Sequence, residues 1–377
     1  MSNGQQPVHI AHLLWHFGTG GLENGVVNLI NKLPEQGFSH SIITLTGHQS
    51  EFAKRIKRPD VQIYSLNKKE GHDWGTFYRL NRLLKQLQPD ILHSRNLNTL
   101  ELQLVGWWRR VPLRIHGEHG WDINDLAGSN KKYQWLRRLL QHFVHRFVCL
   151  STESEQYLSA VIGIASAKIT RICNGVDLDR FGNNAAAVFN ELPADSLLFG
   201  SVGRLASVKN HRLLLDAFAV LQNNPANQHC RLLLTGDGPC RDALEQQALT
   251  LGITDKVHFA GNRNDIAAIM QRIDVFVLPS LAEGISNTLL EAMAAGTAVI
   301  ATAVGGNPDL MPPPLQQRNL VQSGNIGALS DAMQQYAEQP DLVKLHGDLV
   351  KNYCQQHFSI DRMVQRYQAL YQITGTT

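Results

Sequence analysis

The sequence predicts an α/β protein built from two doubly wound parallel sheets. Short apolar runs alternate with amphipathic stretches along most of the 377 residues, which is the rhythm of βαβ units. A non-periodic stretch at 183–195, which contains Pro193, interrupts this rhythm, and the pattern then restarts. We therefore expect two domains of ordinary size. They comprise residues 1–185, joined by a returning helix at 361–377, and residues 186–360.

The composition is that of a globular protein, with 43% hydrophobic and 18% charged residues. The five cysteines have no paired spacing, which argues against a disulfide framework or a zinc site and suits a reducing cytoplasm. The N-terminus lacks a basic segment followed by a long apolar core, and no apolar run is long enough to cross a bilayer. We expect a cytoplasmic protein.

Charge is distributed unevenly along the chain. Residues 1–185 contain 22 Lys and Arg against 15 Asp and Glu, whereas residues 186–377 contain 13 against 17. A basic first half favours an anionic partner, such as a phosphorylated substrate or the inner face of the cytoplasmic membrane. Nucleic acid is not an expected partner, because the sequence has no Arg-rich or aromatic nucleic-acid motif.

The first half opens with a strand at Val8–Leu14 and a glycine-rich turn that contains Gly20, Gly21 and Glu23. A helix is predicted next, and backbone N–H groups at such a junction can approach a phosphate. Tight packing of strand on helix explains the glycines equally well. The turn is not the dinucleotide fingerprint, because Glu23 occupies the place of its third glycine. Further strands are expected at 41–45, 61–66, 91–93, 114–116 and 147–151, and helices at 26–33 and 74–87.

Polar loops follow the predicted strands at 91–93 and 114–116. The first loop carries Arg95 and Asn96 and lies where the sheet opens, and the second carries His119 and Asp122. A histidine just past a strand end, between glycines and beside an acid, suits a site role. The alternative is a structural histidine.

The segment 131–147 (KKYQWLRRLLQHFVHRF) is predicted to be an amphipathic helix with a basic polar side. An ordinary surface helix with its apolar stripe in the core is the favoured interpretation. The alternative is a helix lying on an anionic membrane surface, with Arg137 and Arg138 in contact with lipid.

The second half repeats the pattern. Arg204 and Lys209 occupy one loop before a predicted helix at 211–221. An Arg fork and a Lys point charge can balance a diphosphate without a divalent ion. The polar loop that contains Arg263 suits recognition of a nucleobase by backbone groups. Strands are expected at 197–202, 231–235, 257–261, 275–278 and 299–302, a stiff loop at 311–314, and helices at 326–337 and 363–373.

The stretch Ser280–Gly296 follows a buried strand and places Glu283 in a polar loop. Glu291 lies eight positions later, on a helix that Ser286 or Asn287 caps. The helix N-terminus favours an anion, whereas carboxylates repel phosphate and suit hydroxyl groups. A sugar nucleotide offers both kinds of group. Ordinary loop and helix positions are the alternative for the two acids.

Taken together, these motifs resemble those of family 4 glycosyltransferases with the GT-B fold, over nearly the whole chain. The E-x7-E spacing beside a Gly-Arg…Lys loop is a specific signature. Two stretches, 15–31 and 117–128, are also similar to sugar transferases associated with bacterial exosortase and exopolysaccharide systems. The matching residues are Gly20-Gly21-Leu22-Glu23, His119, Asn174-Gly175-Val176-Asp177, Gly203-Arg204, Lys209, Glu283-Gly284 and Leu290-Glu291-Ala292-Met293.

The resemblance implies two Rossmann-like domains facing across a cleft, with the C-terminal helix crossing back. It implies a retaining transferase that needs no cofactor or metal. The donor is a nucleoside diphosphate sugar, with UDP favoured over GDP, and the acceptor is a glycan or a lipid-linked saccharide. The context implied is bacterial exopolysaccharide or cell-surface polysaccharide synthesis.

The resemblance also assigns roles to residues. Arg204 and Lys209 would hold the diphosphate, Glu291 the ribose and Glu283 the transferred sugar. Gly20 and Gly21 would meet the phosphate from the first domain, and His119 would face the donor sugar. His119, Glu283, Arg204 and Lys209 are thus the expected catalytic group. Further donor-binding candidates are Arg263, Gly284, Ile285, Ser286 and Asn287, and the acceptor-side candidates are Glu23, Arg95, Asn96 and Asp122.

The chain departs from the family pattern beside the first acid, where Ile285-Ser286-Asn287 replaces a common Phe-Gly pair. This leaves the donor sugar open. A sugar-nucleotide-binding partner without catalysis is the alternative function, and the intact acids and His119 disfavour it. An epimerase or dehydrogenase is disfavoured by the failed dinucleotide fingerprint.

Overall fold

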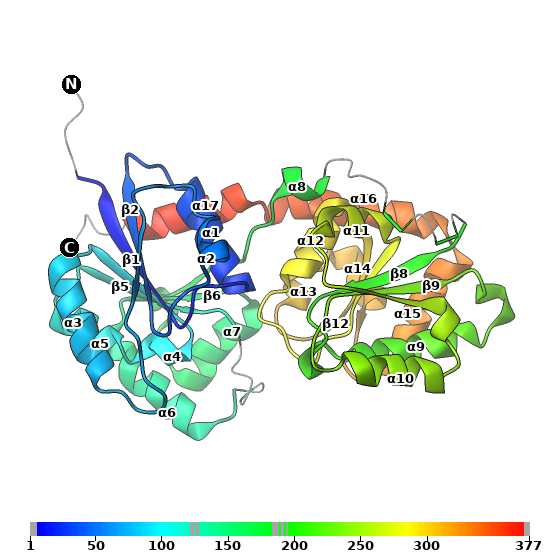
Figure 1. Cartoon of the computed structure of the whole chain (residues 1–377), viewed down its shortest axis with the longest axis horizontal. Coiled ribbons are helices and arrows are strands. Elements are labelled where there is room, and N and C mark those ends of the chain that lie inside the picture. The colour runs from blue at the N-terminus through cyan, green and yellow to red at the C-terminus, as the bar shows by residue number, and fades with distance from the viewer. Residues whose placement is uncertain are drawn as a thin grey trace. The chain divides into compact units, whose positions relative to one another are not determined.

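The computed structural model describes residues 6–120, 125, 128–182, 188–189, 192–193 and 195–372. The chain divides into two compact units (Figure 1). The N-terminal unit comprises Met1–Asn174 with Ile360–Thr377, and the C-terminal unit comprises Gly175–Ser359. The division falls after Asn174, whereas the sequence placed it after residue 185.

The described part of the N-terminal unit forms a parallel sheet of seven strands in the order β3-β2-β1-β4-β5-β6-β7. Strands β2 and β3 extend the sheet on one side of β1, and β4 to β7 extend it on the other. The topological switch point therefore lies between β1 and β4. The strands are β1 Val8–Leu14, β2 Phe38–Thr44, β3 Gln62–Ser65, β4 Ile91–Arg95, β5 Leu113–Glu118, β6 Arg146–Cys149 and β7 Ile169–Arg171.

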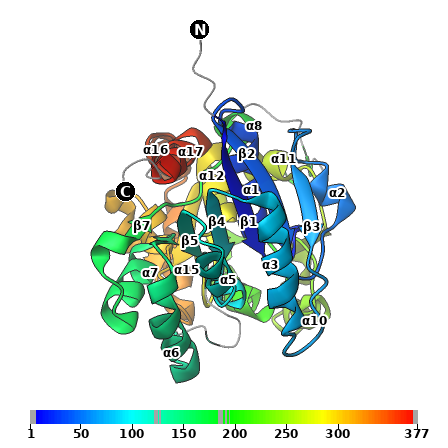
Figure 2. The same cartoon turned by 90° about the vertical axis from the view of Figure 1, so that its left-hand side faces the viewer.

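Helices cover both faces of this sheet (Figures 1 and 2). Ile10 and Ile115 share a buried cluster with α1 and α17, whereas Ala11 and Leu92 share another with α3 and α5. Successive strand residues point to opposite faces, so both faces of the strands are apolar. The helices are α1 Gly21–Lys32, α2 Ser50–Ala53, α3 Gly75–Leu87, α4 Leu97–Leu100, α5 Gln103–Trp108, α6 Lys131–Leu140, α7 Thr152–Gln156 and α17 Ile360–Tyr371, with the short 3₁₀ helices η1 Gln141–Phe143 and η3 Ser166–Lys168 and the π-helix η2 Tyr157–Ile162.

The C-terminal helix α17 belongs to the N-terminal unit, as the sequence predicted. Its Tyr371 is fully buried, and the phenol oxygen lies 2.8 Å from Nδ1 of His93 on β4. Lys32 of α1 and Asp361 of α17 form an exposed ion pair at 3.4 Å. The buried tyrosine fixes the helix far more strongly than this exposed pair, which contributes little to stability.

The described part of the C-terminal unit forms a second parallel sheet, of six strands in the order β10-β9-β8-β11-β12-β13. Its switch point lies between β8 and β11. The two sheets confirm the predicted doubly wound α/β class. The strands are β8 Leu198–Val202, β9 Arg231–Thr235, β10 Val257–Gly261, β11 Val275–Leu278, β12 Ala298–Thr302 and β13 Leu320–Val321.

Helices again pack on both faces of the second sheet. They are α8 Leu178–Gly182, α9 His211–Gln222, α10 Arg241–Thr250, α11 Ile266–Arg272, α12 Asn287–Ala295, α13 Asn307–Leu310, α14 Pro313–Asn319, α15 Ile326–Glu338 and α16 Asp341–His357, with turns η4 Ser207–Lys209, η5 Pro225–Asn227 and η6 Thr254–Lys256.

An aspartate joins the two strands at each switch point. In the N-terminal unit, Oδ2 of Asp90 accepts a hydrogen bond from the backbone N–H of His9 at 2.8 Å. In the C-terminal unit, Oδ2 of Asp274 accepts one from Leu198 at 2.7 Å. The carboxylate thus satisfies a backbone N–H at the start of the opening strand in both units. The two units share this aspartate-to-backbone hydrogen bond, which agrees with the restart of the sequence pattern in the second half.

Three sequence expectations about elements were wrong. The helix predicted over 131–147 ends at Leu140, because the apolar residues beyond it are needed by β6, which pairs with β5 and β7. Arg137, expected on the basic surface of that helix, is buried and pairs with Glu118 at 2.7 Å. The stiff loop expected at 311–314 contains the start of α14, since proline is well suited to the first turn of a helix.

The 17-residue helix α16 was not predicted. Its buried residues, Gly347, Val350 and Cys354, are few, so its sequence has a weak apolar stripe. Among the described helices, none is long and apolar enough to cross a membrane.

Candidate functional site

The loops after β8 and β11 meet at the switch point of the C-terminal unit. The backbone N–H of Leu281 donates to the carbonyl of Val208 at 2.8 Å, which ties the loops together. Next to this bond, Nζ of Lys209 lies 2.7 Å from Oε1 of Glu283. Two residues predicted separately from the sequence, 74 positions apart, therefore form one charge pair where ligands bind open α/β sheets.

Glu283 is oriented by buried neighbours. Ser280 is fully buried, and its Oγ donates to the same Oε1 at 2.6 Å. The Ser280 carbonyl in turn accepts from Oγ1 of Thr302 at 2.7 Å. Oε1 is thus occupied by two donors, whereas no described residue donates to Oε2. One carboxylate oxygen remains for a ligand hydroxyl.

Close backbone contacts support the Glu283 loop from the β12 side. Gly305 has a φ of +57°, and a Cβ at this position would lie 1.8 Å from the carbonyl oxygen of Glu283. The N–H of Gly306 donates to the Gly284 carbonyl at 3.0 Å. Ile285 is buried and lies against Gly306. Only glycine allows this approach, so the shape of the loop depends on a turn that the sequence analysis left without a site role.

The Arg204 loop is also held by backbone contacts. The N–H of Gly203 donates to the Thr235 carbonyl at 2.9 Å, and that of Leu205 donates to Asp237 at 3.0 Å. The Arg204 side chain itself is exposed, and within the described ranges its guanidinium makes no hydrogen bond or ion pair. A rigid loop with a free guanidinium is suited to binding an anion bidentately.

Helix α12 begins directly after the Glu283 loop. The Oγ of buried Ser286 accepts from the N–H of Leu289 at 3.3 Å, so Ser286 is the cap and Asn287 is the first helical residue. One turn further along, burial raises the pKa of Glu291 to about 7, partly opposed by Arg180 on α8. A carboxyl group with such a pKa changes charge near neutrality and is a candidate for a functional site.

Arg263 lies apart from the Lys209–Glu283 pair, in the loop after edge strand β10 and two strands away from β8. Its guanidinium bonds both carboxylate oxygens of Asp265 at 2.9 and 2.6 Å and lies over the Phe189 ring at 5.2 Å. The Arg263 guanidinium therefore already interacts with neighbouring side chains.

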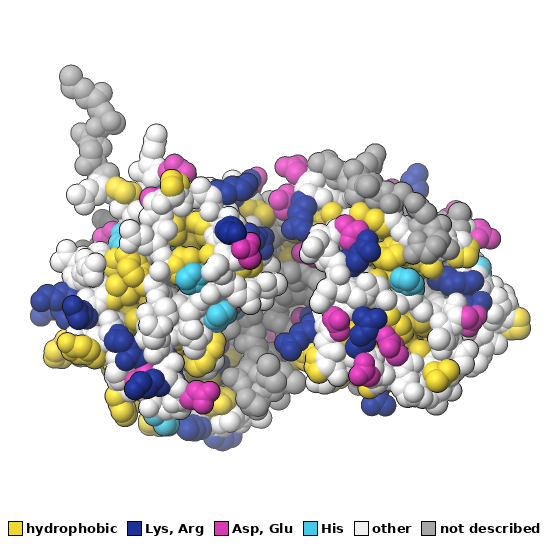
Figure 3. Space-filling model, viewed as in Figure 1, with side chains coloured by type: hydrophobic (Ala, Val, Ile, Leu, Met, Phe, Trp, Pro, Cys, Tyr) yellow, Lys and Arg dark blue, Asp and Glu magenta, His cyan; other side chains and the backbone are white. Residues whose placement is uncertain are grey.

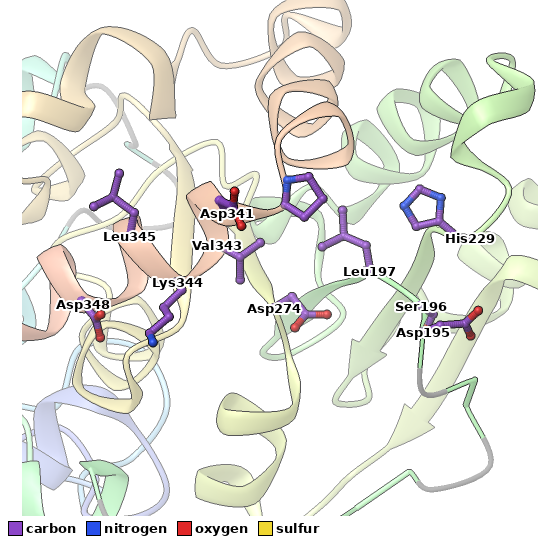
Figure 4. A pocket seen from close by; sticks show the side chains of 11 residues that line it. Asp195, Ser196, Leu197, His229, Asp274, Asp341, Val343, Lys344, Leu345 and Asp348 are labelled. Carbon is purple, nitrogen blue, oxygen red and sulfur yellow. The ribbon is translucent and has the colours of Figure 1, made fainter.

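A cavity of about 710 Å³ lies at the opposite end of the strands of the same sheet (Figure 4). It is lined by residues just before β8 and β11, such as Leu197 and Asp274, and hence lies at the amino ends of the strands. Asp195, Asp341 and Asp348 also line it. Several carboxylates repel a diphosphate, so this cavity does not suit the anionic ligand that Arg204 and Lys209 indicate.

In the N-terminal unit, Asn96 holds the His119 loop at the switch point. Asn96 adopts a φ of +62°, and its N–H donates to the Gly117 carbonyl at 2.8 Å. Its side-chain Oδ1 accepts from the backbone N–H of His119 at 3.0 Å. The structure thus brings these two predicted residues together. Asp122 lies outside the described residues.

The His119 imidazole is enclosed and neutral. Burial lowers the pKa of His119 to about 3, with Arg95 adding to the effect. Both ring nitrogens are buried, and neither bonds a group in the part of the chain that the structure describes. A neutral imidazole offers one donor and one acceptor, so it is suited to contact a ligand hydroxyl.

Arg95 is buried beside His119 rather than open to solvent. Its guanidinium donates to Nδ1 of His12 at 3.2 Å and to the His93 carbonyl at 3.3 Å. A small cavity of about 10 Å³ touches Arg95, His119 and Asn174. Arg95 therefore acts on this region as a fixed positive charge.

Glu23 folds back over the first turn of α1. A Cβ on Gly20 would lie 2.2 Å from Oε2 of Glu23, so the carboxyl group lies against Gly20. Burial raises the pKa of Glu23, while Arg95 opposes the shift. Gly21 is exposed at the helix start. In this conformation a carboxylate, rather than open space, adjoins the glycines predicted to meet a phosphate.

Ser280, Gly305 and Gly306 support the site but were not among the predicted residues. A signal was present in Val304-Gly305-Gly306-Asn307-Pro308, a glycine-rich turn directly after a predicted strand. Ser280 gave no such signal, because a single serine after a strand is common.

Comparison with known proteins places the chain in a family. Residues 19–180 match the model described as Glycosyltransferase Family 4, and residues 184–353 match Glycosyl transferases group 1. The lipopolysaccharide core biosynthesis glycosyltransferase LpsE of Rhizobium meliloti is 36% identical over 300 residues, which are 78% of each chain.

Two further proteins are similar over most of their length. An Escherichia coli UDP-Gal:alpha-D-GlcNAc-diphosphoundecaprenol alpha-1,3-galactosyltransferase is 27% identical over 327 residues, 81% of this chain and 82% of the relative. The structure of Anabaena HepE in complex with UDP and glucose superposes with a TM-score of 0.80 at 17% identity, over 97% and 99% of the two chains. With two GT-B-like sheets and this match to both halves, the chain belongs to the family 4 glycosyltransferases and is a glycosyltransferase.

Proposed function

We propose that the enzyme transfers a hexose from a UDP-sugar to a lipid-linked saccharide, with retention of anomeric configuration, in bacterial cell-surface polysaccharide synthesis. A GDP-sugar is the second choice of donor. The Lys209–Glu283 pair at the β8/β11 switch point, beside the free guanidinium of Arg204, is the observation that carries this proposal.

The three charged groups suit a diphosphate and a sugar together. Lys209 has three N–H donors and uses one on Glu283, which leaves two for phosphate oxygens. Arg204 adds a fork of donors. These groups stabilise the charge that develops on the leaving phosphate, and we propose that no metal ion is required. The leaving phosphate then accepts the proton of the attacking hydroxyl on the same face of the sugar.

The acids take the hydroxyl groups of the donor. Oε2 of Glu283 is the expected acceptor for a hydroxyl of the transferred sugar, because Oε1 is already occupied. Glu291 is the expected partner of the ribose. We assign acceptor recognition to the N-terminal unit, with Glu23 as a candidate contact and neutral His119 near the reacting sugar.

The names of the relatives support the choice of donor and acceptor. The Escherichia coli relative takes galactose from UDP-Gal to a diphosphoundecaprenol-linked acceptor. The Anabaena structure holds UDP and glucose. These properties are carried to this chain as part of the proposal.

A donor panel tests the proposal. We expect one UDP-sugar to raise the melting temperature of the enzyme most, since a ligand at 100 times its Kd stabilises the folded state by about 2.7 kcal/mol. Transfer to a diphosphoprenol-linked saccharide should then persist in EDTA, and NMR should show an anomer that matches the donor. Stabilisation by none of the UDP- or GDP-sugars would refute the donor class.

Asn96→Gly tests the positioning of His119. Glycine accepts the positive φ at this position but removes the Oδ1 that holds the His119 N–H. We expect kcat to fall about tenfold, the value of one lost hydrogen bond, with little change in the KM for donor. Asn96→Asp, which keeps an acceptor oxygen, should retain more activity. Equal kcat values for Asn96→Gly and the wild type would contradict this role.

A further inference from the structure

An exposed tryptophan lies at the carboxyl edge of the N-terminal sheet, and the proposed mechanism does not use it. Trp15 directly follows β1 and is 44% exposed. It belongs to the connection from β1 to α1, which also carries Gly20. Ligands of open parallel sheets bind outside the carboxyl ends of the strands. The Trp15 ring therefore lies at the edge of the sheet where an acceptor is expected.

The hydrophobic core does not account for the Trp15 ring. By strand alternation, Trp15 continues the row of Ala11 and Leu13, which are buried in one cluster with Leu45 and Leu66. Among the described residues, Trp15 is not one of the partly buried hydrophobic side chains that pack against this cluster. An indole left in water is stabilised by a ligand that covers it.

The backbone around Trp15 is fixed by the segment that follows β2. The Trp15 carbonyl accepts hydrogen bonds from the backbone N–H groups of Leu45 at 3.1 Å and Thr46 at 3.0 Å. Oγ1 of Thr46 donates to the same carbonyl at 3.0 Å. Two residues further on, the N–H of Phe17 donates to the Gly47 carbonyl at 3.1 Å. A ring on a fixed backbone loses little conformational freedom when a ligand covers it.

The loop after β3 places a lysine over the same ring. Nζ of Lys68 lies 5.6 Å from the centroid of the Trp15 ring and donates to the Gly71 carbonyl at 2.6 Å. Asp73 holds this loop closed, since its Oδ2 accepts from the N–H of Lys69 at 3.0 Å. The cation–π contact therefore comes from a braced loop and helps to orient the indole.

Polar side chains lie around the ring. Thr46 is exposed, and its Oγ1 lies 3.3 Å from Nδ1 of His16. When the Thr46 hydroxyl donates to the Trp15 carbonyl, Nδ1 of His16 is the donor in this contact and Nε2 is left as an acceptor. On the face that Figure 3 shows, hydrophobic side chains of the N-terminal unit form small groups separated by polar atoms. These surroundings suit a small amphipathic ligand better than a broad apolar partner.

We propose that Trp15 stacks on a non-reacting sugar ring of the acceptor, with His16 and Thr46 in contact with the hydroxyl groups of that ring. One face of a pyranose presents C–H groups, which match an indole, and its outward hydroxyl groups match polar side chains. The inference rests on the proposed function for the class of acceptor. It adds the residue that selects a saccharide, away from the groups assigned to the donor.

Saturation-transfer NMR on the full chain tests this contact without a donor. The probes are methyl glycosides of glucose, galactose, N-acetylglucosamine and N-acetylgalactosamine, and disaccharides built from them. We expect at least one disaccharide to receive saturation mainly at the C–H protons of one ring face. Trp15→Ala should weaken its binding about tenfold, which corresponds to about 1.4 kcal/mol. Trp15→Phe, which keeps a flat ring, should lose less.

Trp108→Ala is the matched control. Trp108 is 71% exposed and ends α5, which leads into β5, so it lies at the amino ends of the strands. This variant should bind the disaccharide as the wild type does. Equal binding by Trp15→Ala and the wild type, equal loss in Trp108→Ala, or no saccharide binding by the wild type would overturn the proposal. Melting temperatures check that each variant is folded.

Kinetics and UDP titration separate this inference from the assignment of the donor. In the transfer assay, Trp15→Ala should raise the KM for the saccharide acceptor about tenfold and leave the KM for the donor unchanged. UDP affinity should be the same in Trp15→Ala and the wild type. Failure of the wild type to bind UDP would refute the donor class and leave the saccharide contact standing. An increase in the KM for the donor alone would refute the role of Trp15.

Discussion

We expect Lys209→Ala to lower the affinity of the enzyme for UDP about 100-fold and its rate of transfer at least as much. The Lys209 ammonium lies at the β8/β11 switch point, held by Glu283 at 2.7 Å. Its removal takes away a charge-assisted hydrogen bond to phosphate, worth about 1.5–3 kcal/mol. It also removes a group that stabilises the leaving diphosphate in the transition state. Isothermal titration with UDP and steady-state kinetics measure the two effects.

A second effect of Lys209→Ala must be separated from the first. The side chain of Glu283 is only 9% exposed, so losing Lys209 leaves a carboxylate without its partner. UDP lacks the transferred sugar that Glu283 is expected to bind, and Glu283→Gln alone should therefore leave UDP affinity nearly unchanged. Lys209→Ala with Glu283→Gln should bind UDP as weakly as Lys209→Ala. Recovery of UDP affinity in the double variant would show that Lys209 acts on Glu283 and not on phosphate.

Two further single variants test the assignment of the diphosphate site. Arg204→Ala should also weaken UDP binding, whereas Lys344→Ala should not, because Lys344 lines the cavity at the amino ends of the strands. Unchanged UDP affinity in both Arg204→Ala and Lys209→Ala would refute the assignment of the diphosphate site.

Donor affinity should depend on pH through Glu291. Burial raises the pKa of Glu291 to about 7 in the free enzyme. Ribose hydroxyls donate hydrogen bonds and so favour the ionised carboxylate, which means that binding requires loss of the proton below pH 7. Affinity for a UDP-sugar should fall about tenfold for each pH unit below 7 and level off above it. A UDP-sugar is the better probe, because it lacks the terminal phosphate of UDP that titrates nearby.

Glu291→Gln is the control for this pH dependence. It should bind the donor weakly at pH 8, with affinity nearly independent of pH. In the absence of donor, the stability of the folded enzyme depends on pH in the opposite direction. A raised carboxyl pKa means that the folded state binds more protons than the unfolded chain, so stability falls as pH rises from about 4.5 to 7. The same pH dependence of affinity in Glu291→Gln and the wild type would contradict the ribose assignment.

Helices and strands with a strong pattern of apolar residues could be predicted from the sequence, and those with a weak apolar pattern could not. Strand β1 at Val8–Leu14 and strand β11 at Val275–Leu278 were predicted with their observed bounds, because buried parallel strands are continuous apolar runs. Helix α16 was missed because it buries little of its length. The end of α6 was wrong because local periodicity extends into residues that β6 uses.

The sequence alone determined the two-sheet α/β class and the residues that carry charge after each strand. The periodicities of strands and helices are local properties of the sequence. Arg204, Lys209, Glu283 and Glu291 belong to motifs that can be recognised in the sequence itself. The tertiary structure decided which of them touch. Lys209 and Glu283 pair because β8 and β11 are neighbours across the switch point, and Glu291 has its raised pKa because α12 is buried. Contacts and burial depend on residues far apart in the chain, so no local pattern could specify them.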